Sequence, residues 1–400
     1  TKLPDPIHPP SDNFGAVHFG EYWQQLGIYA EGWYAQLPDI PVMFLSSWYD
    51  AYVPSTLANF HAFCAAGRQA PQRFIMGPWL HGDRIIIHSG NAEFGAQAAL
   101  DGAIAPDWLT CRLDWFSRHL CAETPEQDGR REVSVFIMGG GSGRRDDAGR
   151  LQHGGQWHHA QDWPLPGSRR EQWYLQADMG LRPQAATAAA HILQSDPHHP
   201  VPTIGGSITS GLPVFAGGAF NQREAPGFFG SAGNNLPLAA RADVLVFQSE
   251  PLTEDLCVAG DVRVRLWIDS DAPDTDFTAK LVDVYPPNED YPQGYAMNIT
   301  DGIIRCRYRN SWTQPELLQP GEVVEVVIEP FATCNLFKKG HRLRLDIAGS
   351  NFPHFDCNPN SGEAEGEARG KRTATSRVHV GGIHASVLEL EVLPAAALKG

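Results

Sequence analysis

The sequence lacks several signals that would assign it to common classes of protein. It contains no run of eighteen apolar residues, so no membrane-spanning helix is predicted. Basic residues are few, with 31 Lys and Arg against 46 Asp and Glu, and the net charge is −15. Because nucleic-acid binding needs a basic face, we expect no nucleic-acid partner. The seven cysteines are odd in number and show no CxxC spacing, which predicts neither a disulfide framework nor a zinc site.

The start of the chain also lacks two features. It begins with "TKLPDPIHPP", without methionine and without the apolar core of a signal peptide. Cysteine usage favours free thiols in a reducing compartment, so we expect a cytoplasmic protein. A start at Thr1 in a proline-rich loop leads us to expect that the chain begins within a longer gene product.

The first 125 residues show an alternation of strands and helices. The apolar run "IPVMFLSSWYD" predicts a strand buried on both faces, and Ser55 is expected to cap the helix "STLANFHAFCAAG". The run "QRFIMGPW" predicts the next strand, which completes a strand–helix–strand unit of a parallel sheet. Asp107 is expected to cap a helix over "WLTCRLDWFSRHL". Its apolar residues recur at helical spacing and predict one packed face: Leu109, Leu113, Phe116 and Leu120.

The remainder of the chain has a different pattern. Glycine and proline are frequent, with 40 and 31 residues, and short segments of alternating apolar and polar residues follow one another from about residue 130. This pattern predicts an antiparallel β-sandwich, most simply a jelly roll. The expected strands are "REVSVFIMGG", "REQWYLQA", "DVLVFQS", "DVRVRLWIDS", "TDFTAKLVDVYP", "GIIRCRYRN", "EVVEVVIEPFATCNLF", "HRLRLDIAGS" and "SRVHVGG…SVLELEVLP".

An acid and a base follow the two predicted buried strands. Asp50 comes directly after the first strand and His81 directly after the second. Neighbouring parallel strands lie about 4.8 Å apart, and functional groups gather past their carboxyl ends. A carboxylate placed there would fix the tautomer of the imidazole and leave Nε2 to act as a base. Either residue alone is better interpreted as an ordinary loop residue, but the two together, acid before base, favour a catalytic pair.

The nucleophile that such a pair needs is missing. No G-x-S-x-G motif occurs, and the nearest approximations, at Ser142 and Ser207, lie after the histidine and outside a strand-to-helix turn. Ser46 and Ser47 belong to the strand that carries Asp50. In α/β-hydrolases the nucleophile precedes the acid, so we expect it on a segment upstream of this chain.

The motifs "SSWYDAYVPSTLANFHAF" and "RFIMGPWLHGD" resemble the cocaine esterase and glutaryl-cephalosporin acylase family. That family is related to X-prolyl dipeptidyl aminopeptidases and α-amino-acid ester hydrolases. The later segments "WFSRHL", "VFIMGGGSGRR", "GGQWHHAQDWP" and "GHRLRLDIAGSNFPHFDCNPNSG" are similar to the family's C-terminal jelly roll. The resemblance runs from about residue 20 to residue 393.

This resemblance implies an architecture. Residues 1–38 would be the end of a helical cap, residues 39–125 the C-terminal part of an α/β-hydrolase domain, and residues 126–400 the jelly roll. Asp50 would be the triad acid and His81 the triad base. No position matches the family's serine or its oxyanion-hole donors. Aromatic residues near the pair are expected to bind an apolar or aromatic acyl group: Tyr52, Trp48, Trp79 and Trp33.

The implied function is a serine hydrolase that cleaves an ester or amide by acyl transfer, with its serine supplied by an N-terminal half on the same gene product or a separate chain. No cofactor is expected. No metal is expected either, since the aspartate-rich "DSDAPDTD" (269–276) has Pro273 at a ligand position and reads as a capped turn. A homo-oligomer is an open possibility. The alternative is a pseudoenzyme whose jelly roll is a non-catalytic binding module, which would present an exposed aromatic platform.

Overall fold

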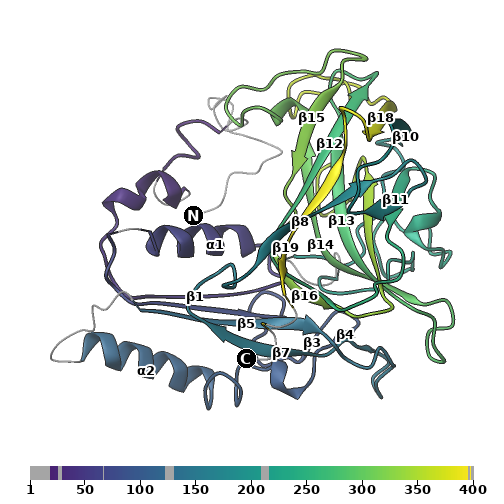
Figure 1. Cartoon of the computed structure of the whole chain (residues 1–400). Coiled ribbons are helices and arrows are strands. Elements are labelled where there is room, and N and C mark those ends of the chain that lie inside the picture. Colours follow the sequence, from purple (N-terminus) through teal and green to yellow (C-terminus); the bar gives the residue numbers. More distant parts are fainter. Residues whose placement is uncertain are drawn as a thin grey trace.

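The structure is a computed structural model that describes residues 19–25, 29–65, 67–121, 130–208, 216–394 and 397. A small layer of parallel strands with helices lies beside a large β-sandwich (Figure 1). The expected end of a helical cap falls partly outside the described residues. Its described part includes the 3-10 helix η2 (Ala30–Gln36), and Tyr34 of η2 donates a hydrogen bond to Asn59 at 2.8 Å.

The parallel layer contains three strands in the order β1, β2, β5. β1 (Val42–Ser47) and β2 (Gln72–Gly77) pair in parallel, and β2 pairs in parallel with β5 (Arg131–Gly139). The helix α1 (Val53–Phe63) joins β1 to β2, while α2 (Trp108–Leu120) precedes β5. The two helices lie on opposite sides of the strands (Figure 1). The predicted strand–helix–strand unit is confirmed.

The helix ends follow the sequence signals only in part. Asp107 caps α2 as predicted, accepting a hydrogen bond from the Thr110 backbone N–H at 2.7 Å. The prediction that Ser55 caps α1 is wrong. The helix begins earlier, at Val53, because Pro54 already has the backbone angle of a first helical turn. Ser55 instead donates its hydroxyl to the Tyr52 carbonyl.

The prediction of which side of α2 packs on the sheet is also wrong. Cys111 is the residue of α2 that the structure buries. The four residues of the expected apolar face are all more than half exposed: Leu109 (57%), Leu113 (55%), Phe116 (54%) and Leu120 (75%). The periodicity therefore marks an apolar surface that no described residue covers.

The sandwich consists of two sheets. A twelve-stranded sheet contains the parallel strands and most of the sandwich, and a four-stranded antiparallel sheet has the order β11-β17-β13-β14. The predicted antiparallel sandwich is thus present. The bounds of its strands are β7 (Gly155–Ala160), β8 (Arg169–Leu175), β9 (Leu181–Arg182), β10 (Ala189–Ser195), β11 (Val244–Gln248), β12 (Leu256–Ser270), β13 (Asp276–Tyr285), β14 (Tyr295–Arg305), β15 (Val324–Ile328), β16 (Thr333–Phe337), β17 (Arg342–Ala348), β18 (Ala374–Val380) and β19 (Val387–Leu393).

Short elements complete the chain. A three-stranded sheet, in the order β3-β4-β6, is formed by β3 (His88–Ser89), β4 (Ala92–Glu93) and β6 (Leu151–Gln152), and the further 3-10 turns are η3 (Ala96–Ala98), η4 (Leu238–Ala240) and η5 (Cys306–Tyr308). Of the helices in the described ranges, none is long and apolar enough to cross a membrane.

β5 was predicted to open the jelly roll, but it pairs in parallel with β2 and so belongs equally to the parallel layer. It also pairs in parallel with β16 and antiparallel with β7. The sheet therefore continues across the expected boundary between residues 125 and 126. The segment "EVVEVVIEPFATCNLF", expected as one strand, forms the separate strands β15 and β16, with Pro330 in the connection.

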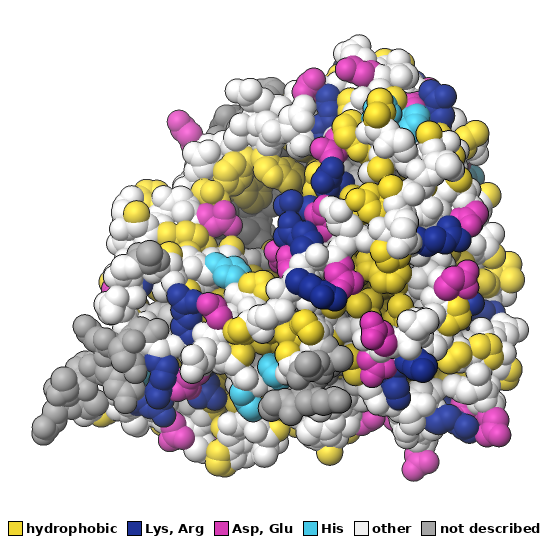
Figure 2. Space-filling view, in the orientation of Figure 1, with side chains coloured by type: hydrophobic (Ala, Val, Ile, Leu, Met, Phe, Trp, Pro, Cys, Tyr) yellow, Lys and Arg dark blue, Asp and Glu magenta, His cyan; other side chains and the backbone are white. Residues whose placement is uncertain are grey.

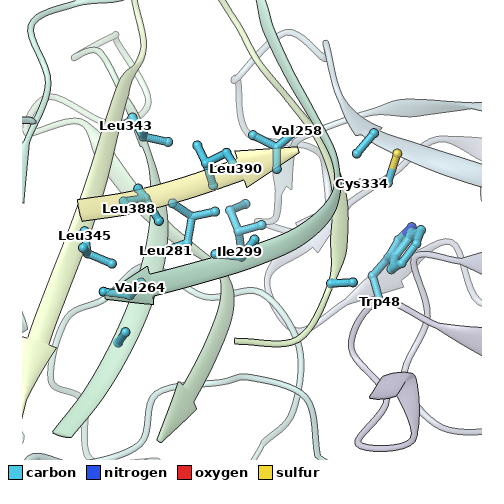
Figure 3. Packing of buried hydrophobic residues seen from close by; sticks show 14 of the residues in the cluster. Trp48, Val258, Val264, Leu281, Ile299, Cys334, Leu343, Leu345, Leu388 and Leu390 are labelled. Carbon is cyan, nitrogen blue, oxygen red and sulfur yellow. The ribbon is translucent and has the colours of Figure 1, made fainter. Parts of the chain in front are cut away.

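The two sheets of the sandwich enclose the core. Leucines of β17 face leucines of β19 across the sandwich, and side chains of β12, β13 and β14 fill the space between them (Figure 3). Trp48, just past β1, packs at the edge of the same cluster, so the parallel layer and the sandwich share one core. The residues labelled in Figure 3 are Trp48, Val258, Val264, Leu281, Ile299, Cys334, Leu343, Leu345, Leu388 and Leu390.

A buried histidine also links the parts of the structure. His153 follows β6 and is completely buried. Its Nε2 is 2.8 Å from the Oδ1 of Asn335 on β16, and its Nδ1 contacts the Tyr285 hydroxyl on β13. Asn335 Oδ1 accepts only, so Nε2 carries the proton and Nδ1 accepts from Tyr285. Burial lowers the pKa of His153 to about 4.

Because the pKa of His153 is lowered, we predict that the protein loses stability in mild acid. The unfolded chain takes up a proton near pH 6.5, which the folded chain does not bind until about pH 4. The free energy of unfolding should therefore fall as the pH drops through this interval, by about 3 kcal/mol at pH 4 from this residue. Urea denaturation of the wild type and of His153→Gln at stepwise pH measures it. The variant curve should be flatter, and parallel curves would refute the assignment.

Candidate active site

The ends of β1 and β2 stay joined beyond the strands themselves. The Trp48 N–H donates to the Gly77 carbonyl at 2.9 Å, and the Tyr49 N–H donates to the Trp79 carbonyl at 3.3 Å. The Ser47 hydroxyl reaches the Leu80 carbonyl at 3.2 Å. These bonds continue the parallel register, so the two segments leave the sheet side by side. The residues that come next are Asp50 and His81.

Asp50 and His81 form the expected hydrogen bond. Oδ2 of Asp50 lies 2.9 Å from Nδ1 of His81, and Oδ1 accepts the Tyr52 backbone N–H at 3.0 Å. Asp50 is buried at 4% exposure, whereas the His81 side chain is 52% exposed. A buried carboxylate with both oxygens hydrogen-bonded is held in place and orients the ring. Nδ1 is thereby occupied, and Nε2 is the ring nitrogen left to exchange a proton with a substrate or nucleophile.

Tyr52 borders this pair as predicted for a substrate-contacting residue. Its ring is 5.3 Å from the His81 ring, in an edge-on arrangement, and the residue is 52% exposed. An exposed aromatic ring beside the exposed edge of a histidine provides an apolar surface for a bound group. Its role in substrate binding stays a prediction.

The prediction that Trp48 and Trp79 contact substrate does not fit their positions. Both are almost fully buried, at 1% and 2% exposure. The Trp48 indole N–H donates to the Phe136 carbonyl and the Trp79 indole N–H donates to the Ala98 carbonyl, each at 2.8 Å. Their rings are enclosed by the core and fasten the loops that carry Asp50 and His81.

Trp33 lies in η2 and is partly buried. Its indole N–H donates to the Gln24 carbonyl at 3.0 Å. The Arg68 guanidinium holds η2 near α1 by donating to the Tyr34 carbonyl at 2.7 Å. No contact between Trp33 and the Asp50–His81 pair is found among the described residues, and its role in substrate binding stays a prediction.

Ser142 and Ser207, which lie in the segments most similar to a G-x-S-x-G motif, do not contact His81. Ser207 is 1% exposed and donates its hydroxyl to the Trp48 carbonyl, which makes it a structural residue. Ser142 lies on an exposed loop and donates to Gln152 at 2.6 Å. The aspartates of residues 269–276 are engaged in ion pairs, with Asp274 bound to Arg307 and Asp276 to Arg305. Across the described ranges, no group of three or more His, Cys, Asp or Glu side chains is arranged to hold a metal ion.

A hollow separates the start of α1 from the sandwich. It is a cavity of about 230 Å³ whose α1 side is formed by Pro54 and Leu57. Figure 2 shows the hollow, with Lys and Arg side chains on its sandwich side. Its charged lining comes from β8, β12, β19 and the residue that follows β15, and it includes Arg170 and Arg263. Both arginines form ion pairs. Arg170 pairs with Glu391 at 3.0 Å, and Arg263 pairs with Glu329 at 2.5 Å.

Comparison with protein families identifies the larger part of the chain. Residues 128–389 match the model of the X-Pro dipeptidyl-peptidase C-terminal non-catalytic domain. The chain belongs to this family. The relation to X-prolyl dipeptidyl aminopeptidases inferred from the sequence motifs is thereby confirmed.

Similar proteins extend the relation over nearly the whole chain. The chain is 31% identical over 399 residues to a cocaine esterase of Rhodococcus sp. (strain MB1 Bresler), a match that covers 96% of this chain and 60% of that protein. It thus spans about three fifths of the length of that relative.

Solved structures share the fold. An aminopeptidase from a Thaumarchaeota archaeon of marine sediment has a TM-score of 0.74, 24% identity, and coverage of 94% of this chain and 58% of that one. An α-amino acid ester hydrolase has a TM-score of 0.69 at 22% identity, over 95% of this chain and 60% of the other. These structures show that the parallel layer and the sandwich occur together in known folds.

Because residues pack closely behind His81, we predict that a larger side chain at Gly77 destabilises the protein. A Cβ added to Gly77 would lie 2.4 Å from the Trp79 ring, so that ring must move. Gly77→Ala should lower the free energy of unfolding by about 1–3 kcal/mol, as overpacked cores do. Chemical denaturation measures the effect. Gly227→Ala is the control, since nothing lies within 4 Å of its added Cβ. Equal stability of the two variants would contradict the packing described.

Proposed function

We propose that this chain supplies the acid and the base of a serine hydrolase that cleaves esters or amides by acyl transfer. The observation that supports the proposal is the 2.9 Å bond between the buried Asp50 carboxylate and the half-exposed His81 ring. The relatives named as cocaine esterase and α-amino acid ester hydrolase agree with this reaction class. Residues 39–125 then represent the C-terminal part of an α/β-hydrolase domain, and the sandwich is its non-catalytic companion.

In the proposed mechanism each group has one step. His81 Nε2 removes the proton from the attacking serine hydroxyl and later returns it to the leaving group. Asp50 keeps Nδ1 protonated and stabilises the positive charge that forms on the ring. The serine and the oxyanion-hole donors come from a polypeptide that corresponds to the part of the relatives outside the match, either on the same gene product or on a separate chain. No cofactor takes part in this chemistry.

The substrate is a small ester or amide with an apolar or aromatic acyl group. Tyr52 supports this class because its exposed ring lies 5.3 Å from the ring of the base. An acyl group seated against this ring would lie beside the base.

Loss of the base should abolish hydrolysis. The test measures the release of p-nitrophenol from p-nitrophenyl butyrate and benzoate by the intact product, meaning this chain joined to or mixed with the polypeptide that carries the serine. His81→Ala and Asp50→Asn should each reduce kcat by about 10³-fold or more, as removal of a triad member does. His81→Ala removes one hydrogen bond of the buried Asp50 carboxylate, so it should lower the free energy of unfolding by about 1–3 kcal/mol and still leave the protein folded.

A second aspartate–histidine pair provides a matched control. His199 Nδ1 lies 2.9 Å from Oδ2 of Asp196 on the sandwich, the same distance as in the candidate site. The His199 side chain is 83% exposed and the Asp196 side chain 35%. His199→Ala should leave hydrolysis unchanged. Activity that survives His81→Ala, or an intact product that hydrolyses neither ester, would refute the proposed function.

A binding module is the second candidate, and one observation favours it. Trp312 is 63% exposed and stacks on Tyr308 with ring centroids 5.8 Å apart, and the Tyr308 hydroxyl donates to Glu365. Tyr308 itself is buried at 9% exposure, so the pair offers one flat exposed ring, that of Trp312, which suits the apolar face of a sugar. Affinity electrophoresis in gels containing soluble xylan or mannan should then show retardation that Trp312→Ala abolishes. Phe229→Ala, which alters another exposed aromatic ring, is the control. Absence of retardation in both polysaccharides would exclude this candidate.

A further inference from the structure

A second large cavity is built by the sandwich. Its volume is about 570 Å³, and its lining comes from the connection between β17 and β18 (residues 356–371), from the end of β14 with η5, and from His198 after β10. None of the described residues that line it belongs to β1, β2 or the loops that carry Asp50 and His81. Cavities of this size bind small organic molecules in many proteins. The cavity is therefore a place in the fold separate from the candidate active site.

Two arginines held by buried aspartates form one wall of this cavity. Asp276 accepts two hydrogen bonds from Arg305, both at 3.0 Å, and Asp274 accepts one from Arg307 at 2.7 Å. Asn358 donates to both aspartates, at 2.9 and 2.8 Å. Both carboxylates are almost fully buried, so this network fixes the two guanidinium groups in one position. A wall fixed in this way is preorganised for a ligand.

Arg307 keeps one donor group that the protein does not use. Its Nε and Nη2 donate to the Asp274 carboxylate and the Glu363 carbonyl, at 2.7 and 2.8 Å. Its Nη1 donates to no residue in the described ranges, although the side chain is only 7% exposed. A nearly buried charged donor without an acceptor is unfavourable, so this nitrogen favours an acceptor from outside the chain. Carboxylate and phosphate oxygens are the acceptors that suit a guanidinium group best.

Two exposed cations of the lining also have no carboxylate partner. The Lys371 ammonium makes its one hydrogen bond within the described structure to the Pro197 carbonyl, at 3.5 Å. The Arg369 side chain forms no ion pair with any described residue. Exposed arginines on the opposite part of the sandwich are paired, as Arg170 and Arg263 are with their glutamates. Arg369 and Lys371 are therefore available to a ligand.

The acidic residues of the lining are engaged by the protein itself. Glu365 accepts from Arg305 at 2.7 Å, and Glu363 accepts the Arg369 backbone N–H at 3.0 Å. Asp356 is exposed and lies 3.8 Å from Arg305. Lys and Arg outnumber Asp and Glu in the lining by four to three, whereas in the whole chain they are outnumbered by 46 to 31. The hydrogen-bonding capacity left for a ligand is thus mainly that of positively charged donors.

We propose that this cavity, which we call the anion pocket, binds a small organic anion through its carboxylate or phosphate groups. Arg307 Nη1, Arg369 and Lys371 are the donors. The ligand is larger than a single phosphate ion, because the volume leaves room for a carbon skeleton of tricarboxylate or sugar-phosphate size. An anionic polymer is disfavoured, since the net charge of −15 repels it outside the pocket. This inference does not depend on the proposed function.

The anion pocket is suited to binding and not to nucleophilic chemistry. Cys357 is the residue of nucleophilic type in its lining, and no serine or threonine accompanies it among the described lining residues. Burial raises the pKa of the Cys357 thiol to about 11, and the neighbouring Asp356 carboxylate raises it further. The reactive thiolate is therefore scarce at neutral pH.

Isothermal titration calorimetry of the intact product tests the pocket. The probes are citrate and glucose 6-phosphate, with glucose as the uncharged counterpart of the second. At least one of the two anions should bind saturably with a Kd of about 1 mM or tighter, and glucose should not. Arg369→Ala combined with Lys371→Ala should weaken this binding about tenfold or more, because two charged donors are lost. Both side chains are exposed, so the double variant should stay folded.

A matched control removes the same charge elsewhere. Arg112→Ala combined with Lys339→Ala takes two positive charges from exposed positions outside the pocket and should leave the Kd unchanged. Asp356→Asn removes a negative charge from the lining and should tighten binding about threefold, an effect that a loss of structure does not produce.

Several results would overturn the inference. The first is that neither anion binds saturably up to about 10 mM. The others are that glucose binds as tightly as glucose 6-phosphate, that the pocket variant and the control variant lose affinity equally, or that Asp356→Asn weakens binding. His81→Ala should bind the anion as the wild type does, so failure of the proposed hydrolysis leaves this test intact.

Discussion

The candidate site depends on the in-register pairing of β1 with β2. Partner residues run from Val42 with Gln72 to Ser47 with Gly77, and the hydrogen bonds from Trp48 and Tyr49 extend this pairing past the strand ends. Parallel strands point their carboxyl ends the same way, so both loops start from the same edge. A slip of one residue would turn the side chains of β1 to the opposite faces and separate the acid from the base.

The sandwich fixes the loop of the acid from the other side. Tyr49, next to Asp50, donates its hydroxyl to the Asn298 carbonyl on β14 at 3.0 Å, and burial raises the pKa of that hydroxyl. The Trp48 indole reaches β5, while the Trp48 carbonyl accepts the Ser207 hydroxyl. Segments between 88 and 249 residues away in the sequence therefore hold the residues that precede Asp50. A domain without catalytic residues of its own thus contributes to the site by making one conformation of this loop stable.

The sequence was sufficient to predict the individual strands and helices near the site. It was insufficient to predict which strands pair with one another and which way side chains point. Apolar runs and turn signals located β1, α1, β2 and α2, and the strand-end rule placed Asp50 beside His81. The same signals misassigned β5, because an apolar strand has the same composition whichever neighbours it pairs with, and its pairing with β2 and β16 is long-range. Trp48 and Trp79 were misread because nearness in the chain does not fix the direction of a side chain.

The length of the Asp50–His81 bond does not by itself distinguish a catalytic pair, since Asp196 and His199 are equally close. The difference lies in the burial of the acid together with the exposure of the base: Asp269 is as deeply buried as Asp50, but its partner His379 is 19% exposed whereas His81 is 52% exposed. A carboxylate at the surface can exchange its histidine for water at little cost, whereas a buried one must keep its hydrogen bonds. Asp50 is buried and held by the Tyr52 N–H, so it orients His81 before any substrate is bound. In the proposed mechanism, preorganisation of this kind would lower the cost of reaching a reactive geometry.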